Sequence, residues 1–264
     1  MDDVLQNIMD HAVAVAREAG QVVREALCDE KQRDVMTKSS TVDLVTQTDQ
    51  RVEHLIIQSV KKKFPTHRFI GEESVAAGEA CVLTDDPTWI IDPIDGTTNF
   101  VHSFPFVAVS IGFSVDKKIQ FGVVYSCLED KMFTARRVSD QEGQRSIIAT
   151  EFGSNRETET VEKIFSSLRN ILNIPGCVLS AAVNMCLVAS GCVEAYYEVG
   201  VHVWDVAAGS VIVEEAGGVL MDVEGGPVDL MSRRIVAANN GTVAHIVKEI
   251  DAFSPTRDDA PPTQ

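Results

Sequence analysis

Two aspartates three residues apart, Asp92 and Asp95, lie in a string of residues that could bind a metal ion (residues 92–98, DPIDGTT). The apolar run Trp-Ile-Ile directly before the string predicts a buried strand that ends at Asp92. Pro93 fixes the turn that follows, so the two carboxylates can converge, and the carbonyl of Ile94 could add a third oxygen. A DxxD spacing alone is a weak signal, because most such pairs are surface or capping acids. The whole string with its buried lead-in is a strong signal.

The same string could also bind a phosphate group. Gly96 lets the chain pass close to an anion, and the backbone amides of Gly96 and Thr97 could point at it. The string therefore offers ligands for both a metal ion and a phosphate.

Two further acids stand at the ends of predicted elements. Glu72, in the tetrapeptide GEES (71–74), follows a predicted strand at 69–70 and a glycine that permits a sharp turn. Asp205 follows Trp204 and opens an apolar helix. Taken alone, the tetrapeptide is better explained as the start of a helix, and Asp205 is explained equally well as a helix N-cap.

The distribution of charge favours the metal interpretation. Residues 69–116 and 170–232 contain no Lys or Arg, and each interval holds eight acids. Such runs usually form solvated acidic surfaces. Asp92 and Asp205, however, lie in apolar surroundings, and buried carboxylates without basic partners need another cation. Mg²⁺ is the divalent ion that best fits oxygen ligands of this kind.

Length and composition indicate a globular protein with a substantial core. The chain has 264 residues, of which 45% are hydrophobic. The net charge of −16 argues against binding to nucleic acid or to an anionic membrane. The six cysteines are scattered, and neither a signal peptide nor a long apolar run is present, so we expect a cytoplasmic protein with reduced thiols.

Helical and strand patterns interleave along the chain without a strict βαβ rhythm. The predicted helices lie near 4–31, 48–64, 157–170, 180–190, 205–216 and 243–251. The predicted strands lie near 69–70, 89–91, 107–115, 119–125, 132–135, 193–197, 219–223 and 235–238. We therefore expect one layered α/β domain over 1–253 with mixed or antiparallel sheets, followed by a loosely ordered tail over 254–264.

Considered together, these segments resemble the signature motifs of the inositol monophosphatase family. The resemblance is carried by residues 38–40 (KSS), 43–49 (DLVTQTD), 71–74, 89–106, 204–218 (WDVAAGSVIVEEAGG) and 231–234 (MSRR). It implies a layered αβαβα sandwich of the inositol monophosphatase/fructose-bisphosphatase type. It also implies a homodimer that hydrolyses inositol monophosphates with two or three Mg²⁺ ions per site and is inhibited by Li⁺.

The resemblance further implies a role for each residue of the site. One Mg²⁺ would be held by Glu72, Asp92 and the carbonyl of Ile94, and a second by Asp92, Asp95 and Asp205. Glu72 and Thr97 would position and activate the attacking water, with Asp49 and Lys38 supporting them. The residues expected to contact the substrate are Glu72, Ile94, Asp95, Gly96, Thr97, Ser180, Ala181, Glu198 and Asp205.

Two segments depart from the family pattern. Residues 138–143 replace a glycine-rich hairpin, so two strands are expected to be shortened or missing. Leu179 stands where the family has a glycine, and a nearby arginine is absent, which affects the expected recognition of the sugar. Two alternatives therefore remain: a related phosphatase of sugar or nucleotide bisphosphates, or a catalytically weakened dimer that acts as a binding protein. His202, close to Asp205, is expected to be structural.

Overall fold

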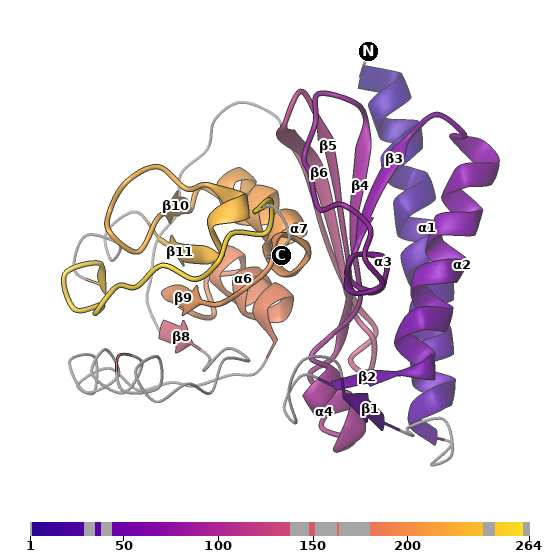
Figure 1. Ribbon diagram of the computed structural model, residues 1–264, viewed down its shortest axis with the longest axis horizontal. Coiled ribbons are helices and arrows are strands. Elements are labelled where there is room, and N and C mark those ends of the chain that lie inside the picture. Colours follow the sequence, from indigo (N-terminus) through magenta and orange to yellow (C-terminus); the bar gives the residue numbers. More distant parts are fainter. Residues whose placement is uncertain are drawn as a thin grey trace.

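Helices and sheets alternate as layers. The computed structural model of the protein describes residues 2–28, 35–37, 44–137, 148–150, 163, 180–239 and 246–260. Helices α1 and α2 cover one face of a five-stranded sheet, and α6 and α7 lie between its other face and a four-stranded sheet (Figure 1). The layered α/β class predicted from the sequence is confirmed. Of the helix expected near 157–170, the structure describes residue 163 alone, and that residue is helical.

The first layer consists of α1 (Asp2–Cys28) and α2 (Gln47–Lys63). Apolar residues recur along both helices at spacings of three and four, and they share one core with the first sheet. Ala12 and Ala19 are fully buried, so α1 approaches the sheet closely. Pro65 follows the end of α2, as predicted.

The first sheet has the strand order β3-β4-β5-β6-β7. Its strands are β3 (Arg68–Gly71), β4 (Thr88–Asp95), β5 (Ala108–Val115), β6 (Lys118–Ser126) and β7 (Lys131–Arg136). The pair β3–β4 is parallel and the other pairs are antiparallel, which confirms the predicted meander. All eight residues of β4 are buried, because helices cover both faces of the sheet at this interior strand.

A pair of glycines sets the distance between the first sheet and α7 (Val203–Glu215). Gly112 on β5 and Gly122 on β6 are directly opposite each other in the ladder. A Cβ atom at Gly112 would lie 2.9 Å from the Cβ of Ala207, and one at Gly122 would overlap the backbone carbonyl of Ala208. The helix therefore lies directly on the sheet backbone at this point.

The second sheet has the strand order β10-β11-β9-β8. Its strands are β8 (Ile148–Thr150), β9 (Ala195–Val199), β10 (Val219–Met221) and β11 (Arg234–Ala238). Strand β8 is parallel to β9 and was not predicted. Helix α6 (Ala181–Ala189) packs beside α7 between the two sheets.

Several short elements complete the described chain. They are the hairpin strands β1 (Val35–Thr37) and β2 (Leu44–Thr46), the helices α3 (Glu72–Ala76) and α4 (Thr97–Val101), and the 3-10 helix η2 (Leu230–Ser232). The hairpin was not predicted. In the described part of the last predicted helix, residues 247–249 form a turn. Within the described ranges, no helix is both long enough and apolar enough to cross a bilayer.

The C-terminal segment differs from the loosely ordered tail expected over 254–264. As far as Ala260 it runs back over the second sheet towards α7 (Figure 1). The side chain of Asp258 is only 3% exposed and accepts a hydrogen bond from the backbone N–H of Val203 at 2.8 Å. Residues 261–264 lie outside the described part.

Candidate active site

The DPIDGTT string forms the end of β4, where the ladder with β5 is interrupted. Asp92 pairs with Ser110 and Asp95 with Ala108, and the register shifts between the two pairs. Pro93 has no N–H to donate to a ladder. The N–H of Ile94 donates instead to Oδ1 of Asp92, at 3.0 Å. An irregularity of this kind re-aims side chains, and here it lies between the two predicted aspartate ligands.

Asp92 lies in a strongly acidic and buried environment. Its side chain is almost inaccessible to solvent. Burial raises the pKa of Asp92 well above its usual range, and the negative charges of Glu72, Asp95 and Asp205 raise it further. The structure therefore brings the four predicted carboxylates close enough to repel one another.

Asp95 connects the end of β4 to the start of α6. Its Oδ2 accepts hydrogen bonds from the hydroxyl of Ser180 and from the N–H of Ala182, the latter at 2.8 Å. These bonds favour the ionised form, but burial outweighs them and raises the pKa of Asp95 to about 6. Ser180, predicted as a substrate contact, caps α6 and binds a predicted metal ligand. Ala181 follows it as a buried residue.

Asp205 lies in the first turn of α7. Its Oδ2 accepts the N–H of His202 at 2.7 Å, a bond that leaves Oδ1 for another ligand. Burial raises the pKa of Asp205 well above its usual range, with further contributions from the charges of Asp95, Glu72 and Glu198. Glu198, on β9, is buried and accepts a hydrogen bond from Tyr196. The predicted sugar contact thus lies beside the acidic cluster.

The turn that carries Glu72 is held by a residue that the sequence reasoning missed. The carboxylate of Glu53, on α2, accepts three hydrogen bonds: from the N–H of Glu73 at 2.7 Å, and from the N–H and hydroxyl of Ser74 at 2.9 and 2.6 Å. Burial raises the pKa of Glu53. The sequence did hold a signal: Glu53 lies next to the apolar stripe of α2, and a glutamate that is buried in this way needs a partner.

Thr97 is oriented by two acceptors on different segments. Its hydroxyl lies 3.2 Å from Oδ1 of Asp49 and 3.1 Å from the carbonyl oxygen of Ile94. Gly96 precedes it with a left-handed φ of 91°, and a Cβ atom there would lie 2.9 Å from the carbonyl oxygen of Phe106. Only glycine fits this position without strain.

The donor set suits a hard divalent cation. All the side-chain donors are carboxylate oxygens, and the charges that raise the pKa of Asp92 are all negative. Within the part of the chain that the structure describes, however, no three acidic, His or Cys side chains are already spaced as metal ligands. Lys38 and residues 176–179 lie outside the described residues.

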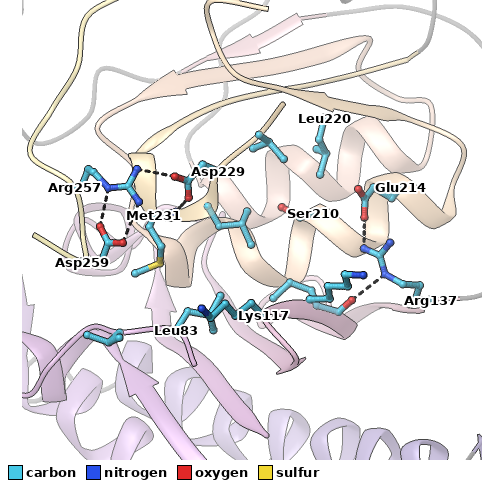
Figure 2. Close-up of a pocket in the computed structure, with 15 residues that line it drawn as sticks. Leu83, Lys117, Arg137, Ser210, Glu214, Leu220, Asp229, Met231, Arg257 and Asp259 are labelled. Atoms are coloured by element: carbon cyan, nitrogen blue, oxygen red, sulfur yellow. Dashed lines mark hydrogen bonds and ion pairs between the residues drawn. The ribbon is translucent and has the colours of Figure 1, made fainter. Parts of the chain in front are cut away.

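A cavity of about 450 Å³ lies away from this cluster, beside the turn between β5 and β6 (Figure 2). Ion pairs line it: Arg137 with Glu214 at 2.6 Å, and Arg257 with Asp229 at 2.6 Å. Its described lining contains none of the predicted site residues. The acidic cluster, and not this cavity, is therefore the candidate active site.

Comparison with solved structures defines the class to which this fold and acidic site belong. The chain resembles the extragenic suppressor protein suhB of Bartonella henselae, with a TM-score of 0.81 and 29% identity over 92% of this chain and 98% of that chain. It also resembles the IMPase of Thermotoga maritima, with a TM-score of 0.78 and 25% identity over 92% and 96% of the two chains. The layered α/β fold of these proteins is shared.

The sequence comparison identifies the family. The sequence model described as the inositol monophosphatase family matches residues 4–252, and the chain belongs to this family. Inositol monophosphatase 1 of Homo sapiens is 59% identical over 277 aligned positions, which cover 98% of this chain and 99% of that protein. The alignment is longer than this chain of 264 residues, so the human protein has residues that this chain lacks.

Proposed function

We propose that this protein hydrolyses inositol monophosphates to inositol and phosphate, with Mg²⁺ as the cofactor. Membership of the inositol monophosphatase family and the high identity to a relative of that name support this activity. The observation that carries the proposal is the cluster of carboxylates around the buried Asp92, whose negative charges raise the pKa values of Asp92 and Asp205.

Oxygen ligands for the metal would come from Glu72, Asp92, Asp95, Asp205 and the carbonyl of Ile94. The family is generally metal-dependent, and Mg²⁺ is the ion that suits carboxylate and carbonyl donors. When bound, such ions lower the pKa of water and neutralise charge on the phosphate oxygens.

The chain's own residues would orient the attacking water. The hydroxyl of Thr97 donates its proton to Asp49 or to the carbonyl of Ile94, so its oxygen can accept a hydrogen bond from a water molecule. Glu72 would accept a hydrogen bond from the same water and take its proton as the water attacks the phosphate. In this proposal Asp49 fixes the rotamer of Thr97, and Glu53 fixes the turn that carries Glu72.

The substrate would bind between α4 and β9. The amides of Gly96 and Thr97 would take phosphate oxygens. Glu198 and Asp205 would accept hydroxyl protons of the inositol ring. Ser180 and Ala181 would contribute the start of α6, where Asp95 already accepts hydrogen bonds.

Further parts of the proposal are inhibition by Li⁺, a homodimeric state and a cytoplasmic location. Li⁺ would compete with Mg²⁺ for the same oxygen ligands. The location is supported by free thiols at Cys81, Cys127, Cys186 and Cys192. The comparisons do not favour the alternatives of a bisphosphate phosphatase or a weakened binding protein.

The test is phosphate release by the purified protein after its metals have been stripped. We expect turnover of inositol 1-phosphate to appear with added Mg²⁺ and to disappear in excess chelator. β-Glycerophosphate and a nucleoside bisphosphate serve as competing substrates. Undiminished turnover in chelator would overturn the metal mechanism, and a strong preference for the bisphosphate would overturn the substrate assignment.

A further inference from the structure

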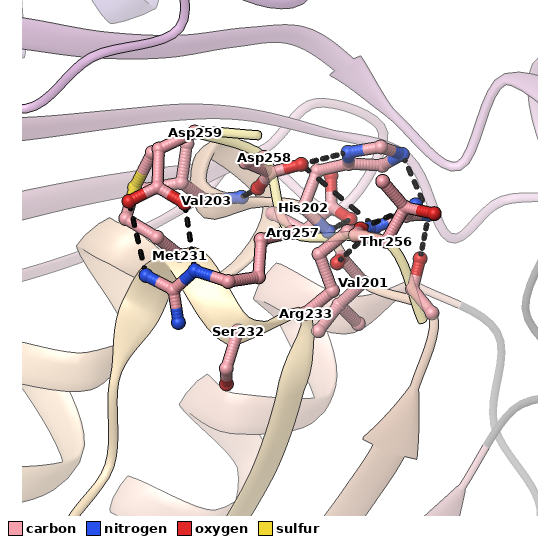
Figure 3. A network of polar contacts seen from close by, with 12 residues as sticks. Val201, His202, Val203, Met231, Ser232, Arg233, Thr256, Arg257, Asp258 and Asp259 are labelled. Carbon is pink, nitrogen blue, oxygen red and sulfur yellow. Dashed lines mark hydrogen bonds and ion pairs between the residues drawn. The ribbon is translucent and has the colours of Figure 1, made fainter. Parts of the chain in front are cut away.

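The MSRR motif (231–234), which the proposed function leaves without a role, holds the C-terminal segment. The guanidinium group of Arg233 donates to the carbonyl of Thr256 at 3.3 Å. The N–H of Asp258 donates to the carbonyl of Met231 at 3.1 Å. These contacts fix the backbone of the segment over η2 and beside the start of α7 (Figure 3).

Neighbouring residues of the C-terminal segment face different partners. Arg257 pairs with Asp229 at 2.6 Å and with Asp259 at 2.7 Å, on the side of the cavity in Figure 2. Asp258 faces α7 instead, and its side chain is 3% exposed (Figure 3). A charged side chain this deeply buried requires partners.

Both carboxylate oxygens of Asp258 accept hydrogen bonds. Oδ2 accepts the backbone N–H of Val203 at 2.8 Å, and Oδ1 lies 2.6 Å from Nδ1 of His202. Nη2 of Arg233 lies 3.0 Å from Nε2 of the same imidazole. A guanidinium group can only donate, so Nε2 accepts and Nδ1–H donates to Asp258. The ring of His202 also stacks on that of Trp204, with centroids 4.5 Å apart.

These contacts surround the backbone that presents Asp205. The first N–H groups of a helix have no partner within the helix. At the start of α7, the N–H of Val203 is taken by Asp258, and the N–H of His202 is taken by Oδ2 of Asp205. Because Asp258 already accepts the N–H of Val203, the carboxylate of Asp205 does not turn to bind that N–H. Its Oδ1 therefore stays available to the acidic cluster.

We propose that Asp258 is a positioning residue for the metal site, because it fixes His202 and the first turn of α7 and thereby holds Asp205 in the orientation that binds the cation. The C-terminal segment is then a part of the active site's support, although it does not touch the substrate. The inference rests on the proposed function only in taking Asp205 as a metal ligand.

The test compares three variants of the full-length chain: Asp258→Asn, His202→Phe and the control Asp259→Asn. Asparagine has the size of Asp258 but offers one acceptor where two donors converge, so one hydrogen bond is lost. Phenylalanine at 202 keeps a ring beside Trp204 and removes the ring's hydrogen bonds. Asp259 lies next to Asp258 but pairs with Arg257.

Each protein is stripped of metal and titrated with Mg²⁺ alone by isothermal titration calorimetry, and kcat is then measured over a range of Mg²⁺ concentrations. We expect the Mg²⁺ dissociation constant to rise about tenfold in Asp258→Asn and about threefold in His202→Phe. At saturating Mg²⁺, kcat is expected to stay within about twofold of the wild type. Asp259→Asn is expected to match the wild type.

A merely structural role would lower Tm and leave the Mg²⁺ affinity of the folded protein unchanged, and that result overturns the proposal. If Asp258→Asn does not fold, the Mg²⁺ affinity and Tm of His202→Phe are compared with those of the wild type by the same criterion. A wild-type protein that binds Mg²⁺ but releases no phosphate would refute the proposed function and still allow this comparison. A shift in affinity equal to that of Asp259→Asn would also overturn the proposal.

Discussion

The acidic cluster has two supports that are built differently: the end of β4 and the start of α7. At the end of β4, Asp92 is fixed by its place in the ladder with β5 and by the N–H of Ile94, two residues away, and Asp95 also accepts hydrogen bonds from the start of α6. At the start of α7, Asp205 is fixed by a helix turn that a segment more than 50 residues further along the chain holds in place.

The difference shows how the two halves of one site depend on different parts of the chain. The β4 support is the end of a buried strand that pairs with β5 on both sides of the interruption. The α7 support depends on tertiary contacts made by a short C-terminal segment, whose residues are half-buried or exposed over 251–260. Contacts of this kind open more easily than sheet ladders.

The strongest way to break the β4 support is Asp92→Asn, which keeps the shape of the side chain and removes its charge. We expect kcat to fall at least 100-fold, about 3 kcal/mol in the activation barrier, because Asp92 would bridge two cations. The fold should survive, since the change relieves repulsion from the neighbouring carboxylates. Steady-state kinetics and circular dichroism provide the measurement. Near-normal turnover would mean that Asp92 only caps the turn at Ile94.

The pH dependence of stability in the metal-free protein tests the β4 support through Asp95. The pKa of Asp95 is raised to about 6 in the folded state, so between pH 4 and 6 the folded chain keeps a proton that the unfolded chain has lost. The free energy of unfolding should therefore fall as pH rises through this window, by up to about 3 kcal/mol from Asp95, and fall further at higher pH as Asp92 and Asp205, whose pKa values are also raised, lose their protons. Urea unfolding in chelator should show this decline.

Asp95→Asn and added Mg²⁺ are the controls for that decline. The substitution removes the titrating group, and the cation favours the ionised carboxylates, so each should flatten the curve relative to the metal-free wild type. An identical pH profile for the wild type and Asp95→Asn in chelator would contradict the assignment.

Glu53→Gln weakens the support of Glu72 from outside the acidic cluster. Glutamine cannot accept all three hydrogen bonds of the turn, so buried donors of Glu73 and Ser74 lose a partner. We expect kcat/KM to fall about tenfold, which corresponds to about 1.4 kcal/mol. Glu79→Gln, at an exposed position of the same region, is the matched control. Equal effects of the two substitutions would show that Glu53 does not position the turn.

Tyr196→Phe should have the smallest effect. It removes the hydroxyl that donates to Glu198 and leaves the ring in the core. We expect KM for inositol 1-phosphate to rise about two- to threefold, well under 1 kcal/mol, with kcat unchanged. Michaelis–Menten kinetics at saturating Mg²⁺ provide the measurement. A loss of kcat without a change in KM would place Glu198 in the chemical step.

The same contrast explains what could be predicted from the sequence. The DPIDGTT string was recognisable because its strand, turn and ligands are neighbours in the chain. The spacing of apolar residues predicted α1 and α2, and helices were also expected at the positions of α6 and α7. The roles of Glu53 and Asp258 could not be predicted in this way. Glu53 binds a turn 20 residues away, and Asp258 binds His202 56 residues away.

Ser180 shows the same limit in another form. The sequence placed it in the substrate loop, but its hydroxyl donates to Asp95, 85 residues earlier in the chain. Only the packing of α6 against the first sheet brings the two together. A side chain expected to bind the substrate thus also holds a predicted metal ligand.

The two opposed glycines beneath α7 limit how this site can change in evolution. A methyl group added at Gly112 meets the side chain of Ala207, two residues after Asp205, so a simultaneous Ala207→Gly exchange would restore the volume. A methyl group at Gly122 meets the backbone oxygen of Ala208, which no side-chain exchange removes. A substitution at position 112 can therefore be accompanied by a smaller side chain at position 207. Position 122 must remain glycine for as long as α7 lies on the sheet.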